Sequence, residues 1–347
     1  MISALLDRVK GGVYGIAYGD AMGMPGELWT QRHLRDHFGW IDRFLPGPDG
    51  HFIVDGFVAG QTTDDTQQSL VLAKVILAGE GKIDPEMFGR RLVEWADDIG
   101  ASEGNFLGPN SAKALQLIRE GAPIEQTGAS GDTNGAAMRV VPVGLSVPAG
   151  DLEALVDAVT ESCRPTHFTD VAISGASLIA AAASAAVEAT EFDEVIEPAL
   201  RAADLGREFG NSTLYGSVRR RTELALSLVR SAQGGASADG GKATDLAVLD
   251  ALYEVAGAGV GMIESAPTAF ALAVASRGDA ARCCRLAANL GGDTDTIAAM
   301  ATGICGAFTG FSALPAEDVA VLEAANPHLD LAGPAEGLCR LRSLRTG

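Results

Sequence analysis

The chain has 347 residues, of which 47% are hydrophobic, so it can bury the core of one large domain or of two ordinary ones. Its 26 Lys and Arg face 45 Asp and Glu, and the formal net charge of −19 argues against a general affinity for nucleic acid or anionic membranes. A negatively charged substrate would therefore need local help from metal ions or helix N-termini.

The cysteines and the N-terminus indicate an ordinary reduced protein. The five cysteines contain no CxxC pair and are odd in number, so neither a disulfide framework nor a zinc site is predicted. The opening MISALLDRVKGGVYG lacks the basic-then-apolar order of a signal peptide, and we expect a cytoplasmic protein. The uncharged run at 171–187 is Ala- and Ser-rich and slightly short for a bilayer, which favours a buried helix over a membrane span.

Apolar residues recur along most of the chain with a spacing near 3.6, which predicts an all-α fold. In DLEALVDAVTESC, for example, one face is apolar and Asp151 is the expected N-cap. The only candidate strand, HFIVDGFV at 51–58, is short and broken by glycine. The Gly- and Ser-rich segment 231–242 is expected to be a mobile loop. Helices are predicted at 3–17, 65–78, 85–98, 110–119, 135–146, 168–189, 193–209, 214–231, 244–258, 266–276, 279–289, 295–309, 316–325 and 335–344.

Two acidic stretches, AGQTTDDTQQSLVLA at 59–73 and GGDTDTIAAMATG at 291–303, each stand where glycine-containing polar sequence becomes a helix. In the first, Thr62 or Thr63 is the expected N-cap; in the second, it is Asp295. Capping explains one aspartate per helix but not a pair at both places, because adjacent like charges repel unless a cation neutralises them.

Aspartate and threonine oxygens without nearby His or Cys favour magnesium or manganese, and two ions could share the two stretches. The competing interpretation is a pair of ordinary solvated helix caps. An EF-hand is not expected, because neither stretch has the ligand-rich loop of about 12 residues.

Several motifs, in this order, resemble the ADP-ribosylglycohydrolase family, which includes the hydrolase that reactivates ADP-ribosylated dinitrogen reductase. They are GIAYGDAMGMPGE (15–27), TTDDTQQ (62–68), LGPNSAKAL (107–115), GDTNGAAMR (131–139), PTHFTDVAISGA (165–176) and GGDTDTIAAMATGICGA (291–307). The resemblance implies a single domain over residues 1–347, folded as a compact orthogonal bundle of helices with a central cleft that holds two Mg²⁺ or Mn²⁺ ions.

The resemblance also assigns residues. The implied metal ligands are Thr63, Asp64, Asp65, Asp293, Asp295 and Thr296. Glu27 matches a family glutamate that can approach the metals or the reactive water, and Glu27, Asp64 and Asp293 are the candidate catalytic groups. The implied substrates are ADP-ribosylated protein or small ADP-ribose derivatives. The stretch 27–50 departs from the protein-directed members, resembles instead a bacterial branch of uncharacterised hydrolases, and keeps a small ribosyl nucleoside as an alternative substrate.

Further candidates surround these groups. Gly108, Asn134 and Gly135 belong to loops whose backbone N–H groups could hold phosphate, although plain helix caps explain them equally well. Asp20 is either a support for the site or a polar group at a helix C-terminus, and His167 is either a substrate contact or a structural histidine. His33, His37 and His51 are expected on the surface or in packing roles; Trp29 or Phe106 could stack on a base, with a core role the safer interpretation.

Three hypotheses follow. The first is a metal-dependent glycoside hydrolase. The second, an all-α isoprenoid synthase, is disfavoured because its aspartates recur over successive helical turns and its cavity is lined by aromatics, which make up only 5% of this chain. The third is a non-catalytic binding protein on the same fold, disfavoured because a scaffold has no reason to keep clustered carboxylates. The sequence carries no signal for oligomeric state.

Overall fold

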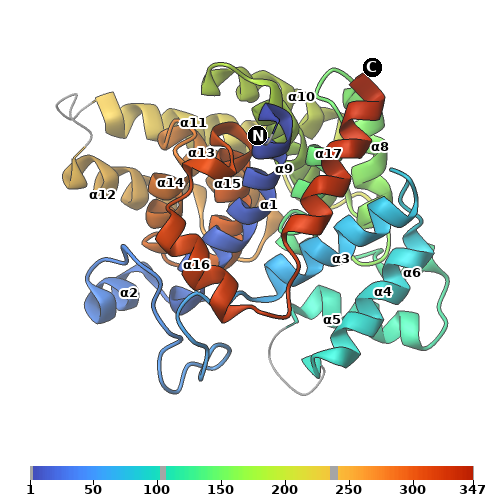
Figure 1. Cartoon of the computed structure of the whole chain (residues 1–347), viewed down its shortest axis with the longest axis horizontal. Helices are drawn as coiled ribbons and strands as arrows, with labels where there is room; N and C mark the ends of the chain where they lie inside the picture. The colour runs from blue at the N-terminus through green and yellow to red at the C-terminus, as the bar shows by residue number, and fades with distance from the viewer. Residues whose placement is uncertain (1–2, 102–106, 235–240, 347) are drawn as a thin grey trace.

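The computed structural model describes residues 3–101, 107–234 and 241–346, and this part of the chain contains helices, turns and three isolated β-bridges but no strand. The all-α prediction is confirmed (Figure 1). The α-helices are α1 (Ala4–Gly23), α2 (Gln31–Phe38), α3 (Asp64–Ala78), α4 (Pro85–Asp98), α5 (Pro109–Arg119), α6 (Ile124–Thr127), α7 (Val141–Ser146), α8 (Leu152–Cys163), α9 (Asp170–Glu188), α10 (Ile196–Gly206), α11 (Val218–Gly234), α12 (Lys242–Ala251), α13 (Met262–Ala275), α14 (Ala280–Ala288), α15 (Thr294–Thr309), α16 (Ala316–Ala325) and α17 (Ala332–Thr346).

The backbones of the two central helices, α1 and α15, approach each other with almost no side chains between them. The glycines of α1 recur one turn apart on the face toward α15, at Gly11, Gly15, Gly19 and Gly23. A Cβ atom added at Gly19 would lie 2.1 Å from the carbonyl oxygen of Ala298. Such close approach requires glycine, because any side chain would force the backbones apart. The contact brings the start of α15 against the end of α1, where the acidic residues gather.

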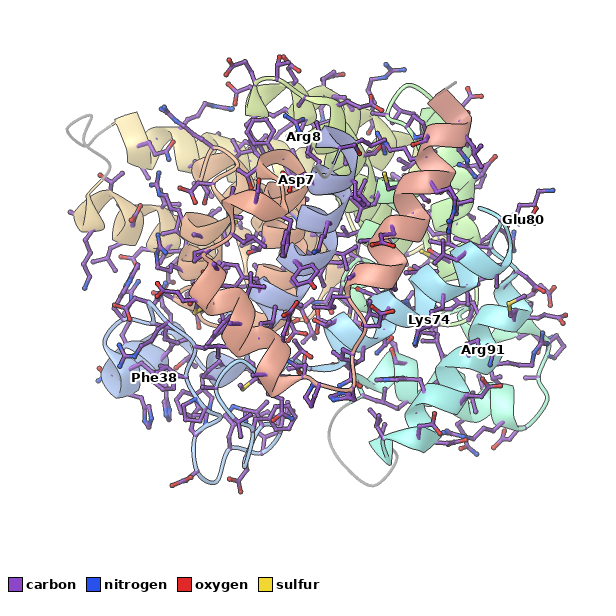
Figure 2. All side chains as sticks on the ribbon, viewed as in Figure 1. Asp7, Arg8, Phe38, Lys74, Glu80 and Arg91 are labelled. Atoms are coloured by element: carbon purple, nitrogen blue, oxygen red, sulfur yellow. The ribbon has the colours of Figure 1, made fainter. Side chains whose placement is uncertain are left out.

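Helix α9 lies in the core, and its 19 residues are long and apolar enough to cross a membrane. In the folded chain 94% of its most apolar window is buried, which agrees with the expected buried helix. Arg8 of α1 ties this helix in place by donating to the carbonyls of Ala186, Val187 and Ala189 at its C-terminal end (Figure 2). A cation there also complements the helix dipole.

Some predicted boundaries are wrong for physical reasons. The helix expected at 135–146 is interrupted: a 3-10 turn (Asn134–Ala136) is followed by α7, because Pro142 has no N–H and is accepted only in the first turn of a helix. Helix α2 is missing from the prediction, since it is short and mostly polar, and only Gln31 and Leu34 of its eight residues are buried. Segment 51–58 forms turns rather than a strand. The loop expected at 231–242 falls partly outside the described residues, with α11 continuing through Gly234.

Candidate active site

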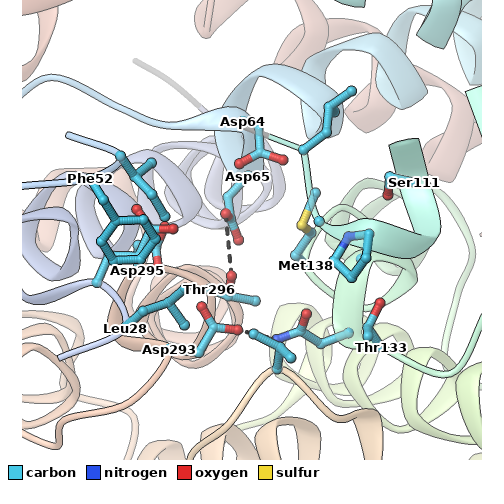
Figure 3. Close-up of a pocket in the computed structure, with 18 residues that line it drawn as sticks. Leu28, Phe52, Asp64, Asp65, Ser111, Thr133, Met138, Asp293, Asp295 and Thr296 are labelled. Carbon is cyan, nitrogen blue, oxygen red and sulfur yellow. Dashed lines mark hydrogen bonds between the residues drawn. The ribbon is translucent and has the colours of Figure 1, made fainter. Parts of the chain in front are cut away.

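The two acidic stretches meet, although they lie more than 220 residues apart in the sequence. Thr63 is the N-cap of α3, as predicted, and its Oγ1 lies 3.2 Å from Asp65 Oδ2 and 3.4 Å from Asp295 Oδ2. From the other side, Thr296 Oγ1 donates to Asp65 Oδ2 at 3.4 Å (Figure 3). We call Thr63, Asp64, Asp65, Asp293, Asp295 and Thr296 the acidic cluster; the first turns of α3 and α15 supply it.

The N-cap of α15 lies two residues earlier than predicted. The helix begins at Thr294, so Asp293 occupies the N-cap and Asp295 lies inside the first turn. The preceding Gly291 and Gly292 have φ of 86° and 80°, a left-handed conformation that glycine adopts without strain. A Cβ at Gly292 would also lie 2.1 Å from the Ala258 carbonyl oxygen. The glycine pair therefore lets this loop turn sharply and present Asp293 beside Asp295.

Burial and mutual repulsion act together on the cluster. Burial, followed by neighbouring carboxylates, raises the pKa values of Asp65 and Asp295 well above their ordinary range. For the same reasons the pKa of Asp64 rises to about 7. Oδ1 of Asp65 and Oδ1 of Asp295 are buried without any hydrogen-bond partner among the described atoms. Such unsatisfied anionic oxygens are costly unless a cation or a proton compensates them.

Asp20 fixes the start of α3 through hydrogen bonds. It is fully buried, and its carboxylate accepts bonds from the backbone N–H groups of Thr63 and Thr66 and from both of their hydroxyls. These bonds satisfy N–H groups that the first helical turn leaves unpaired. Burial raises the pKa of Asp20 to about 6 although the four donors oppose the rise. The structure thus places Asp20 behind the cluster rather than on the cavity wall.

The cluster forms the floor of a cavity of about 340 Å³ (Figure 3). Its described lining includes the carboxylates Glu27, Asp64, Asp65, Asp293 and Asp295, and no described lining residue is Lys, Arg or His. The predicted residues Gly108, Asn134 and Gly135 line it too, with apolar side chains at Leu28, Phe52, Ile53, Leu107, Met138 and Val260. The lining is therefore acidic at the floor and partly apolar around it.

Glu27 reaches the cavity from the segment after α1. Its Oε2 is buried with no hydrogen-bond partner in the described structure. Burial raises its pKa well above the ordinary value, and the nearby charges of Asp293 and Asp64 raise it further. Asn134, which also lines the cavity, donates from Nδ2 to Asp293 Oδ2. Glu27 is thus a buried carboxyl group with a raised pKa, placed next to the cluster.

His167 is buried behind the wall and does not line the cavity. Its Nε2 lies 3.0 Å from the Thr133 hydroxyl and its Nδ1 lies 2.7 Å from the Thr166 hydroxyl. Burial, with a further contribution from the positive charge of Arg139, lowers the pKa of His167 to about 3, so the ring is neutral. Gly135 packs against this ring: a Cβ there would lie 2.7 Å from Cε1. The geometry makes His167 a support for the Thr133 wall.

Sequence reasoning missed the buried chain of bonds behind the cluster. The guanidinium of Arg139, 1% exposed, donates to Gln68 Oε1 at 2.8 Å and to the Thr166 hydroxyl at 2.5 Å. Gln68 in turn donates from Nε2 to Asp64 Oδ2 at 2.7 Å. Arg139 ends the motif GDTNGAAMR and Gln68 ends TTDDTQQ, but no local pattern shows that the two side chains meet.

In the described part of the chain, no three His, Cys, Asp or Glu side chains already converge as a metal-binding group. The donor chemistry still suits a hard cation. The cluster offers carboxylate and hydroxyl oxygens, two of its carboxylate oxygens are buried and unsatisfied, and like charges gather at one place. Mg²⁺ and Mn²⁺ are the divalent ions that favour such ligands.

Comparisons with known proteins agree on one family. The family model described as ADP-ribosylglycohydrolase matches residues 1–345. YegU of Escherichia coli strain K12 is 43% identical over 339 residues, which cover 98% of each chain. The ADP-ribosyl-[dinitrogen reductase] glycohydrolase of Rhodospirillum rubrum is 32% identical over 164 residues, covering 46% of this chain and 51% of that protein. A solved structure titled ADP-ribosylglycohydrolase-related protein complex shares the fold, with a TM-score of 0.70 at 23% identity over 97% of this chain and 99% of that one.

Proposed function

The chain belongs to the ADP-ribosylglycohydrolase family and is a glycoside hydrolase; we propose that it cleaves the glycosidic bond of ADP-ribosyl groups, on protein side chains or in small ADP-ribose derivatives, with two bound Mg²⁺ or Mn²⁺ ions. One observation carries the proposal. The paired acidic first turns of α3 and α15 meet at the floor of a cavity, with buried carboxylate oxygens that lack partners.

The residues that would hold the ions are the six of the acidic cluster. Bound there, the ions would orient ribose hydroxyls and a water molecule and make that water easier to deprotonate. Neutral amide side chains orient two of these ligands by hydrogen bonds: Gln68 donates to Asp64, and Asn134 donates to Asp293. Each amide occupies one carboxylate oxygen and so fixes the direction of the other.

Glu27 is the group that we assign to proton transfer. Its carboxyl lines the cavity and is not hydrogen-bonded at Oε2, so it is available to accept a proton from water. A raised pKa brings a carboxyl group closer to the range in which it exchanges protons efficiently near neutral pH. The remaining negative charge of the floor would stabilise the oxocarbenium-like state through which glycosidic bonds break.

A second candidate is an N-glycosidase that acts on a small ribosyl nucleoside, and the lining favours it. No described lining residue carries a positive charge. A diphosphate in this cavity would depend on backbone N–H groups, such as those of the loops at Gly108 and Gly135, and on the ions.

The decisive experiment measures release of ADP-ribose or ribose from arginine-linked, serine-linked and O-acetyl ADP-ribose and from free nucleosides, with Mg²⁺ or Mn²⁺ and with EDTA. We expect metal-dependent turnover of at least one substrate, and its loss in Asp293→Ala. Binding of Mn²⁺ by both proteins is measured in parallel by calorimetry. Equal turnover by Asp293→Ala would refute the mechanism, whereas tight Mn²⁺ binding without turnover of any substrate would favour a non-catalytic binding protein.

A further inference from the structure

The segment that carries Glu27 is held in a strained conformation. Leu28 has φ of 55°, in the left-handed region that residues other than glycine rarely adopt. On its C-terminal side this turn is pinned to the loop before α15: the Leu28 N–H donates to the Gly292 carbonyl at 2.8 Å, and the Gly292 N–H donates to the Trp29 carbonyl at 2.7 Å. Strain of this kind persists only where neighbouring contacts fix the backbone from both sides.

His51 provides a contact at Glu27 itself. The ring is 5% exposed, and its Nε2 lies 2.9 Å from the backbone carbonyl oxygen of Glu27. Its Nδ1 lies 3.2 Å from the backbone nitrogens of both Ile53 and Val54. Two N–H donors face Nδ1 and an acceptor faces Nε2, so the hydrogen sits on Nε2 and the ring is neutral. One side chain thus ties the 51–54 turn to the backbone of Glu27.

Aromatic neighbours hold the His51 ring in this orientation. Phe52 stacks on it with ring centroids 5.1 Å apart and an interplanar angle of 15°. The Trp29 ring lies 5.4 Å from the His51 ring between centroids, and the exposed His33 ring lies 4.1 Å from the same Trp29 ring. The ring therefore has little freedom to turn away from the Glu27 carbonyl.

We propose that His51 is a positioning residue that holds the backbone at Glu27 and so directs the Glu27 carboxyl into the cavity. Only one consequence of this proposal, the effect of His51 substitutions on kcat, rests on the proposed function. The hydrogen bonds themselves predict a second consequence, local order of the 26–29 segment, that needs no substrate. The sequence interpretation of His51 as a surface or packing residue is thereby extended: it is buried, and both its ring nitrogens bond to the backbone.

Two substitutions separate the bonds that His51 makes. In His51→Gln, the side-chain nitrogen can reach the position of Nε2 and keep the bond to the Glu27 carbonyl. In His51→Asn, the side-chain oxygen can replace Nδ1 and keep the 51–54 turn, but the bond to Glu27 is lost. We expect His51→Asn to lower kcat by about 10- to 100-fold, as misplacement of a reacting group does, with KM nearly unchanged. His51→Gln should stay within about threefold of the wild type.

Hydrogen exchange supplies the readout that does not depend on activity. The peptide that covers residues 26–29 should exchange faster in His51→Asn than in the wild type, and not in His51→Gln. His33→Asn, which alters the same Trp29 cluster without touching Glu27, is the matched control and should change neither exchange nor kcat. Unchanged exchange in His51→Asn, or equal loss of kcat in both His51 variants, would overturn the proposal. If the wild type hydrolyses no glycoside, the proposed function fails, and exchange alone decides the role of His51.

Discussion

Replacing Asp295 with asparagine is expected to make the metal-free protein more stable. Thr63 Oγ1 is within 3.2 Å of Asp65 Oδ2 and 3.4 Å of Asp295 Oδ2, so these carboxylate oxygens lie within about 7 Å of each other. At an effective dielectric constant of about 20, unit charges at that distance repel by about 2 kcal/mol. Asp295→Asn removes this repulsion and loses no bond at Oδ1, which is unsatisfied among the described atoms.

The gain should depend on pH in a definite direction. Burial and repulsion raise the pKa of Asp295 in the folded protein well above its value in the unfolded chain. The folded wild type therefore binds protons that the unfolded chain does not, and its unfolding free energy falls as the pH rises through the folded pKa. Asp295→Asn lacks this titration. Its advantage of about 2 kcal/mol should be full at high pH and should shrink as the pH is lowered.

Urea unfolding followed by circular dichroism measures the effect, in EDTA and then in Mn²⁺, at pH 8 and at lower pH. In Mn²⁺ the order should reverse, because ligand binding to the folded state stabilises the wild type and the variant has lost a ligand. Asp49→Asn, which removes an exposed carboxylate, is the control and should behave as the wild type. The reasoning would be refuted if Asp295→Asn were less stable than the wild type in EDTA at pH 8. It would also be refuted if Mn²⁺ raised the free energy of unfolding of the variant as much as that of the wild type.

Three further predictions concern the supports of the site. Gly19→Ala places a Cβ 2.1 Å from the Ala298 carbonyl oxygen and should lower the free energy of unfolding by about 3 kcal/mol. The control is Gly150→Ala, which should be nearly neutral because an added Cβ there would have no atom within 4 Å. Similar losses of stability in both variants would contradict the packing argument. The pKa of His167 is about 3 in the folded protein, so only the unfolded chain binds a proton at this residue as the pH falls below the ordinary histidine pKa. Between pH 7 and 5.5 the unfolding free energy of the wild type should therefore fall by about 1.3 kcal/mol more than that of His167→Gln in urea titrations; parallel pH curves would contradict this. Gln68→Leu removes the donor to Asp64 and should weaken Mn²⁺ binding by about 10- to 100-fold in calorimetry, and unchanged affinity would show that the amide does not orient that ligand.

Local sequence was sufficient for features that depend on neighbours three or four residues apart. The spacing of apolar residues predicted an all-α fold, and Thr63 and Asp151 cap their helices as expected. Such caps are readable because the side chain and the N–H group that it accepts from lie within one turn. Local reasoning placed the cap of α15 two residues late, because Asp293 and Asp295 are both acceptable caps and only the packing of the glycine loop chooses between them.

The tertiary structure decided which distant groups meet. Paired aspartates at two helix starts indicated a shared cation because of their charge, but nothing local showed that α3 and α15 converge, or that Asp20 anchors one of them. Contacts behind the site are equally long-range: Arg139 reaches Gln68, and His51 reaches the carbonyl of Glu27. A buried polar side chain and an exposed one look alike in a sequence. The difference arises only when the close approach of α1 and α15 through their glycines and small residues closes the core around them.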